Sequence, residues 1–177
     1  MSYVYISLIE PTGNHDLEGL IGEIQKVFRS ETRIIKSKID ISSAYDPVRF
    51  QYDASALLLR LLEDQPPDVR AILGITEVDL FVSIFEFLFG MAQLNGAGAI
   101  LSTYRLKNEL YGLRPDPILF AERLNKEALH ELGHTFGLVH CFNPQCVMNP
   151  STYVEQIDAK SKDLCRQCRT SLLPSFP

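Results

Sequence analysis

An eleven-residue stretch that begins at His130 constrains this chain more than any other, because it contains three of the four histidines. On an α-helix, His130 and His134 lie one turn apart on the same face, so both imidazoles can bind one Zn²⁺ ion. Glu131 lies about 100° further around the helix, where it can reach a water in an open coordination position. His140 can join only if the chain turns back, and Gly137 suits a left-handed helix end. The sequence therefore predicts a three-histidine zinc site with a free position.

Such a zinc site predicts hydrolytic chemistry. The metal lowers the pKa of its bound water toward about 7 and polarises a carbonyl group. Glu131 would take a proton from this water and pass it to a leaving nitrogen, which is hydrolysis of a peptide bond or another amide. The alternative is a helix whose histidines make hydrogen bonds at a surface. The spacing of Gly137 and His140 argues against that alternative.

All four cysteines follow the histidine motif, in two close pairs. Four residues separate Cys141 from Cys146, and two separate Cys165 from Cys168. Four thiolates can bind a second zinc ion tetrahedrally, and this zinc would be structural because no coordination position stays open. It would clamp the loop after His140 to the C-terminal helix. Two disulfides, free thiols and an iron–sulfur cluster are the alternatives.

The length of 177 residues predicts one domain spanning 1–177. Within it, the motifs divide the chain into two sub-domains. The N-terminal one, about 1–137, includes the zinc helix, and the C-terminal one, 138–177, contains the four-cysteine site.

Charge and hydropathy exclude several classes of protein. The net charge of −5 argues against a nucleic-acid partner, although a zinc-ribbon nucleic-acid binder that uses the cysteines is an alternative. The longest apolar stretch, 80–94, is interrupted by polar residues, so no membrane span is expected. The N-terminus lacks the basic segment of a signal peptide. We expect a cytoplasmic monomer without a pro-segment, whose partner is a peptide or protein substrate.

Hydrophobic periodicity predicts an α/β (α+β) fold with a mixed sheet. The helix near the N-terminus would be capped by Asn14 or Asp16, and the next one by Asp53. The predicted strands are 3–9, 31–41, 71–76, 87–93 and 98–104. The predicted helices run from 14 or 15 to 29 and over 54–63, 118–136 and 155–172.

The motif His-Glu-x-x-His-x-x-Gly-x-x-His resembles that of the metzincin zinc peptidases. Within that clan, the cysteine directly after the last histidine resembles the sequence pattern of the archaemetzincin branch. So do the spacing from Cys141 to Cys146, Met148 two residues later, and the pair Cys165 and Cys168. These residues span about a fifth of the chain and are specific in combination.

The resemblance implies a zinc-dependent peptidase with two zinc ions per chain, one catalytic and one structural. Its fold would be a mixed twisted sheet with two helices above an active-site cleft, and the zinc-binding helix and C-terminal helix below. Met148 would lie beneath the metal, against the ligand histidines. A strand beside the cleft, 87–93 or 98–104, would pair with an extended substrate. The implied roles are metal binding by His130, His134 and His140, acid–base catalysis by Glu131, and structural zinc binding by Cys141, Cys146, Cys165 and Cys168.

The sequence departs from many metzincins at one position near the metal. Several of them carry a tyrosine two residues after the methionine, where this chain has Pro150. Tyr153 is near but differently spaced, so the group that stabilises the oxyanion is not predicted. A zinc-stabilised peptide-binding protein with little or no turnover is the second functional hypothesis. The intact Glu131 favours the enzyme, because a binding protein does not need it.

Overall fold

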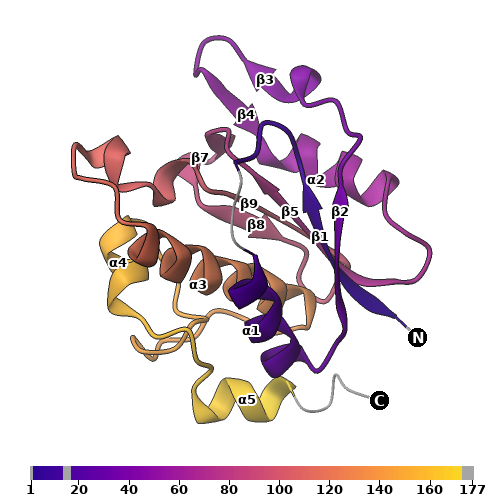
Figure 1. Cartoon of the computed structure of the whole chain (residues 1–177), viewed down its shortest axis with the longest axis vertical. Helices are drawn as coiled ribbons and strands as arrows, with labels where there is room; N and C mark the ends of the chain where they lie inside the picture. Colours follow the sequence, from indigo (N-terminus) through magenta and orange to yellow (C-terminus); the bar gives the residue numbers. More distant parts are fainter. Residues whose placement is uncertain (1, 14–16, 173–177) are drawn as a thin grey trace.

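A five-stranded sheet forms the centre of the structure, a computed structural model that describes residues 2–13 and 17–172. Its strand order is β2-β1-β5-β9-β8 (Figure 1). The first four strands in this order run parallel, and β8 pairs antiparallel with β9 at one edge. The mixed sheet agrees with the predicted α/β class. The strands are β1 (Tyr3–Leu8), β2 (Thr32–Lys36), β5 (Val69–Thr76), β8 (Gly90–Ala92) and β9 (Gly98–Ser102).

The interior strands of this sheet are apolar because both of their faces are covered. In β5, every residue from position 71 to Thr76 is buried. All five residues of β9 are buried as well. Parallel strands of this kind require helices on both faces of the sheet.

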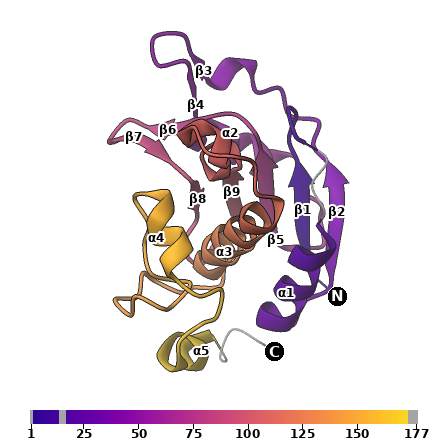
Figure 2. The ribbon, with the colours of Figure 1, turned by 60° about the vertical axis from the view of Figure 1, so that its left-hand side comes forward.

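Helices cover the two faces of the sheet separately (Figures 1 and 2). α1 and α3 pack together on one face, where the rings of Phe28 and Phe136 stack with centroids 4.6 Å apart. α2 packs on the opposite face. α1 lies beside α3, because its buried Leu20 and Ile24 belong to the same core. The helices are α1 (Glu18–Phe28), α2 (Ala54–Glu63) and α3 (Pro117–Thr135).

A second, smaller sheet has the strand order β3-β4-β6-β7. The sequence predicted one strand over 87–93, but the chain leaves this sheet after β7 and enters the central sheet as β8. The buried Phe89 lies between the two strands. The strands are β3 (Tyr45–Asp46), β4 (Gln51–Asp53), β6 (Leu80–Val82) and β7 (Phe85–Leu88). Single 3₁₀ turns cover Ser42–Ala44, Tyr104–Leu106 and Asn108–Tyr111.

The prediction of one continuous C-terminal helix over 155–172 was wrong. The structure has two short helices there, α4 (Val154–Ala159) and α5 (Arg166–Leu172). The chain becomes extended at Lys160, which ends α4 with φ −83° and ψ 157°. Ser161 Oγ then accepts a hydrogen bond from the N–H of Asp163, which forms a local turn that competes with the helix.

Helix boundaries test the predicted caps. Asp53 caps α2 as predicted, because its carboxylate accepts hydrogen bonds from the N–H groups of Ser55 and Ala56. The predicted caps of α1, Asn14 and Asp16, lie outside the described residues, as does its predicted start. Among the helices of the described part of the chain, none is long and apolar enough to span a bilayer.

Replacing Asp53 by alanine is expected to lower the free energy of unfolding by about 1 kcal/mol, because two N–H groups of α2 lose their acceptor. The matched control is Asp64→Ala at the other end of the same helix. The exposed Asp64 lies near the negative pole of the helix dipole, so its removal is not expected to destabilise the fold. Urea denaturation of both variants tests this difference, and equal losses would contradict the assigned cap.

Candidate active site

Helix α3 carries the histidine motif in its buried second half. The helix begins at Asp116, whose side chain accepts hydrogen bonds from the N–H groups of Ile118 and Leu119. Pro117 occupies the first turn, where its missing N–H costs nothing. From Arg123 onward most residues are buried, so the half of α3 that carries the histidine motif is held by packing.

A Schellman turn ends α3 directly after the second histidine. The N–H of Leu138 donates to the carbonyl of Gly133 at 2.9 Å. The N–H of Gly137 donates to the carbonyl of His134, also at 2.9 Å. Gly137 has φ 87°, in the left-handed region that favours glycine. The predicted glycine stop is confirmed, and the chain turns back so that His140 meets the two helical histidines.

The three histidines lie together. Their ligand atoms are within 4.8 Å of one another. His130 Nδ1 lies 2.9 Å from the carbonyl oxygen of Val147. His134 Nδ1 lies 2.8 Å from that of Leu138. Because a carbonyl only accepts, each Nδ1 carries the proton, and each Nε2 keeps a lone pair for a metal.

The nitrogen geometry fits zinc. The Nε2 atoms of His130 and His134 are 3.2 Å apart. Two nitrogens bound tetrahedrally at roughly 2.0–2.1 Å from one zinc would lie about 3.3–3.4 Å apart. Burial lowers the pKa of all three imidazoles, that of His130 well below its usual value, and the charge of Lys160 acts in the same direction. These shifts favour the neutral imidazole, which is the form that binds a metal.

The carboxylate of Glu131 is buried beside these histidines. Burial raises its pKa well above the usual value, and the neighbouring charge of Glu127 raises it further. The ammonium group of Lys160 opposes both effects. A carboxyl group with a raised pKa in a cleft is suited to accept and return a proton.

A cleft of about 690 Å³ lies above α3. β8 is the edge strand beside this cleft, whereas β9 lies inside the sheet between β5 and β8. Of the two segments expected to pair with a substrate, only 87–93 therefore supplies edge strands at the cleft, β8 of the central sheet and β7 of the smaller one. The lining residues are 85–92 and Leu94 on one side, Glu127, His130, Glu131 and His134 on α3, and Val139, His140 and 150–153.

The aromatic side of the cleft is supported by a charged pair. The guanidinium of Arg105 lies 3.9 Å from the ring centroid of Phe87. Two hydrogen bonds of 2.7 Å join the same guanidinium to the carboxylate of Asp79. Phe87 also packs edge-on against Phe89, with centroids 5.8 Å apart. These contacts fix the ring without filling the cleft.

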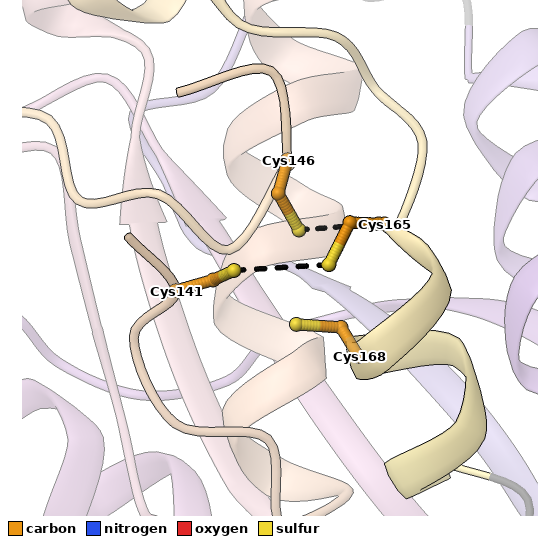
Figure 3. A group of neighbouring side chains, drawn as sticks. All are labelled: Cys141, Cys146, Cys165 and Cys168. Atoms are coloured by element: carbon orange, nitrogen blue, oxygen red, sulfur yellow. Dashed lines mark hydrogen bonds between the residues drawn. The ribbon is translucent and has the colours of Figure 1, made fainter. Parts of the chain in front are cut away.

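The four cysteines converge from two segments, as Figure 3 shows. Cys141 and Cys146 lie in the loop after α3, and Cys165 and Cys168 at the start of α5. The Sγ atoms of Cys141 and Cys165 are 3.7 Å apart. Two sulfurs bound tetrahedrally at roughly 2.3 Å from one zinc would be about 3.8 Å apart, whereas a disulfide needs about 2.05 Å. The spacing therefore fits a four-thiolate metal site, and all four thiols are free of disulfides.

Backbone N–H groups beside the cysteine cluster stabilise negative charge on its sulfur atoms. The N–H of Cys168 is the main cause that lowers the pKa of Cys165 to about 7. The N–H of Cys165 donates to the Sγ of Cys146 at 3.3 Å. Burial raises the pKa of Cys146 and of Cys168. A cation at the centre of the cluster would offset the burial that disfavours the thiolate forms of Cys146 and Cys168.

The loop between the two clusters joins them directly. Val147 offers its carbonyl to His130, and its N–H donates to the carbonyl of Asp163 at 3.0 Å. The N–H of Cys141 donates to the carbonyl of Met148 at 2.9 Å. The side chain of Asn149 donates to the carbonyl of Cys141 at 2.8 Å. Cys141, which directly follows His140, is therefore held by this loop as well as by the cysteine cluster.

The structure adds a buried ion pair that sequence reasoning missed. Lys160 Nζ lies 2.9 Å from Glu127 Oε1, and the two side chains are only 1% and 4% exposed. The contact is an ion pair between two buried charges. The same ammonium donates to the carbonyl of Asn149 at 3.1 Å. Glu127 lies one helical turn before Glu131, a spacing visible in the sequence, but nothing in the sequence marks Lys160 as its partner.

Met148 and Tyr153 have distinct positions near the metal ligands. Met148 is fully buried, and its sulfur lies against Gly133, where a β-carbon would meet it at 2.5 Å. This contact places Met148 against the zinc helix; contact with the histidines stays a prediction. Tyr153 is exposed at the rim of the cleft, and Pro150 also lines it.

Comparison with known proteins now decides the family. The model of peptidase family M54 matches residues 12–173. The chain belongs to this family. The archaemetzincin of Archaeoglobus fulgidus is 35% identical over 169 residues, which cover 96% of this chain and 98% of that protein.

Solved structures of similar proteins agree with the fold. The archaemetzincin of Methanopyrus kandleri superposes with a TM-score of 0.83 at 34% identity, over 98% of this chain and 95% of that one. A zinc-dependent peptidase from Methanocorpusculum labreanum gives a TM-score of 0.82 at 31% identity, over 96% and 99%. The resemblance drawn from the motif and the metallopeptidase class predicted from it are confirmed.

Replacing Lys160 by methionine is expected to destabilise the fold by about 3–5 kcal/mol, because the carboxylate of Glu127 stays buried without its partner. The matched control is Lys162→Met, which breaks a more exposed pair with Glu23 and should cost less than about 1 kcal/mol. The double variant Lys160→Met/Glu127→Leu should recover most of the loss, since both charges are gone. Denaturant unfolding measures all three, and equal effects at the two lysines would contradict a buried pair.

Proposed function

We propose that this M54 peptidase hydrolyses peptide bonds with Glu131 as its general base and acid, and with His130, His134 and His140 as ligands of a catalytic zinc. One observation carries the proposal. The buried carboxylate of Glu131 lines the same cleft as the three imidazoles. The Nε2 lone pairs of the two histidines on α3 are free for a metal.

Glu131 moves the proton in this mechanism. A zinc ion held by the histidines would supply Lewis acidity, which acidifies water and polarises a carbonyl group. Glu131 accepts the proton of the attacking water and returns it to the amide nitrogen that leaves. Its raised pKa supports both directions of transfer, because the carboxyl group can hold the proton between the two steps.

The substrate proposed for the cleft is an extended peptide segment with apolar side chains. An extended chain can add to the free edge of β8 through main-chain hydrogen bonds. The side of the cleft formed by residues 85–92 is rich in apolar groups, among them Phe87, Leu88 and Met91. Folded proteins present few such segments, so peptides and unfolded chains are the substrates we expect.

The second zinc proposed for the four cysteines is structural. Four protein ligands leave no open position for a substrate. The cluster joins the loop after α3 to the start of α5, and Cys141 directly follows His140. Metal binding there would therefore help to place the third ligand of the catalytic zinc.

Replacing Glu131 by glutamine is expected to reduce kcat by about 10²–10⁴-fold with zinc content unchanged, because only the proton acceptor is lost. Cleavage of a fluorogenic peptide library and metal analysis measure both quantities. Glu122→Gln, on the exposed side of the same helix, is the control and should keep full activity. Equal cleavage by the wild type and Glu131→Gln would contradict the proposed role. A wild type that retains peptides without cleaving them would instead favour the peptide-binding alternative.

Metal analysis of the wild type should give about two zinc ions per chain and no iron. His134→Ala should lose the catalytic zinc alone. Cys165→Ser should lose the structural zinc and also bind the catalytic zinc more weakly, since the placement of His140 depends on its neighbour Cys141. Dialysis against graded chelator measures the affinities. An unchanged affinity at the histidines of Cys165→Ser would show that the two sites are independent.

A further inference from the structure

We infer that Gly90 is a positioning residue for peptide hydrolysis, because its missing side chain provides the space in which the carboxylate of Glu131 lies. Gly90 is the first residue of β8 and lines the cleft opposite α3. A β-carbon built at Gly90 would lie 2.7 Å from Cγ and Oε1 of Glu131 and 2.8 Å from its Cδ. These distances are well below van der Waals contact. The inference rests on the proposed role of Glu131.

Backbone conformation does not explain a glycine at this position. Gly90 is not among the described glycines with positive φ, which are Gly112 and Gly137. It pairs with Leu101 in the regular ladder between β8 and β9. Glycine costs conformational entropy in a strand, and alanine would fit this backbone without strain. The remaining reason for glycine is the approach of another group, and the three nearest atoms all belong to Glu131.

Packing is what fixes the carboxylate of Glu131. Within residues 2–13 and 17–172, no hydrogen bond or ion pair is recorded for this carboxylate, although it is buried. Its direction is therefore set by the groups around it, and its Cγ, Cδ and Oε1 lie in the space that a β-carbon of residue 90 would occupy. A methyl group at position 90 would push the carboxylate out of this space.

Displacing a general base lowers kcat more than it weakens substrate binding. Proton transfer requires the carboxylate within hydrogen-bond reach of the water, and a shift of about 1 Å can cost about 100-fold in rate. The histidine ligands do not appear among the nearest neighbours of the added β-carbon, so metal binding should be unaffected.

The first test is the kinetics of Gly90→Ala. We expect kcat to fall about 100-fold, with KM within about twofold and zinc content equal to the wild type. A loss confined to KM would overturn the inference, because it would mean that the methyl group blocks the substrate rather than moving Glu131. Loss of zinc would overturn it too, since the role would then be structural.

The second test is a double-mutant cycle in thermal stability, which needs no activity. Gly90→Ala should lower Tm in the wild type, but not in the Glu131→Ala background, where the clashing atoms are absent. Gly98→Ala is the matched control, because its β-carbon would meet Leu62 at 2.8 Å and Leu58 at 2.9 Å. It should lower Tm equally in both backgrounds and leave kcat unchanged.

These readouts separate the inference from the proposed function. Coupling between positions 90 and 131 in Tm supports the contact even if Glu131→Gln stays active, an outcome that would remove only the catalytic role. If Gly90→Ala fails to fold while the double variant folds, the inference is supported. Additive effects of the two substitutions on Tm would overturn it.

Discussion

The hydrogen bond from His130 to the carbonyl of Val147 is the interaction on which the site depends. It fixes the tautomer and the ring plane of His130, the zinc ligand that we propose, whose orientation α3 alone does not determine. Val147 belongs to the loop that carries Cys146, and its own N–H is bound to Asp163. The conformation of the cysteine loop therefore affects the proposed catalytic site through the backbone, independently of any contact made by His140.

Local spacing was enough to predict most of the site. The helical separation of His130 and His134, the glycine stop at Gly137 and the cap at Asp53 each depend on a few neighbouring residues. Local rules of this kind can be read without the fold. The continuous helix expected over 155–172 failed because the chain must become extended at Lys160, whose ammonium reaches Glu127 on another helix. That requirement is tertiary and leaves no mark in the neighbouring sequence.

The residues missed by sequence reasoning share this tertiary origin. In the sequence, Gly90 is only a glycine that interrupts an apolar strand. The space that it leaves for Glu131 is visible only when β8 lies against α3. The split of the 87–93 segment has the same cause, because one apolar run supplies the edge strands of two different sheets. In this fold the proposed metal ligands come from short motifs, whereas groups that orient His130 and Glu131 come from distant parts of the chain.

The brevity of β8 has a consequence for how this molecule behaves in concentrated solution. An exposed strand edge is a template on which other chains can add and grow into fibrils, and short edges are one way in which proteins avoid this hazard. β8 spans only Gly90–Ala92 and is followed by the turn that contains Asn95. A strand of this length can pair with a single extended segment, but it is too short to template a second sheet. The cleft can therefore remain open without making the protein prone to self-association.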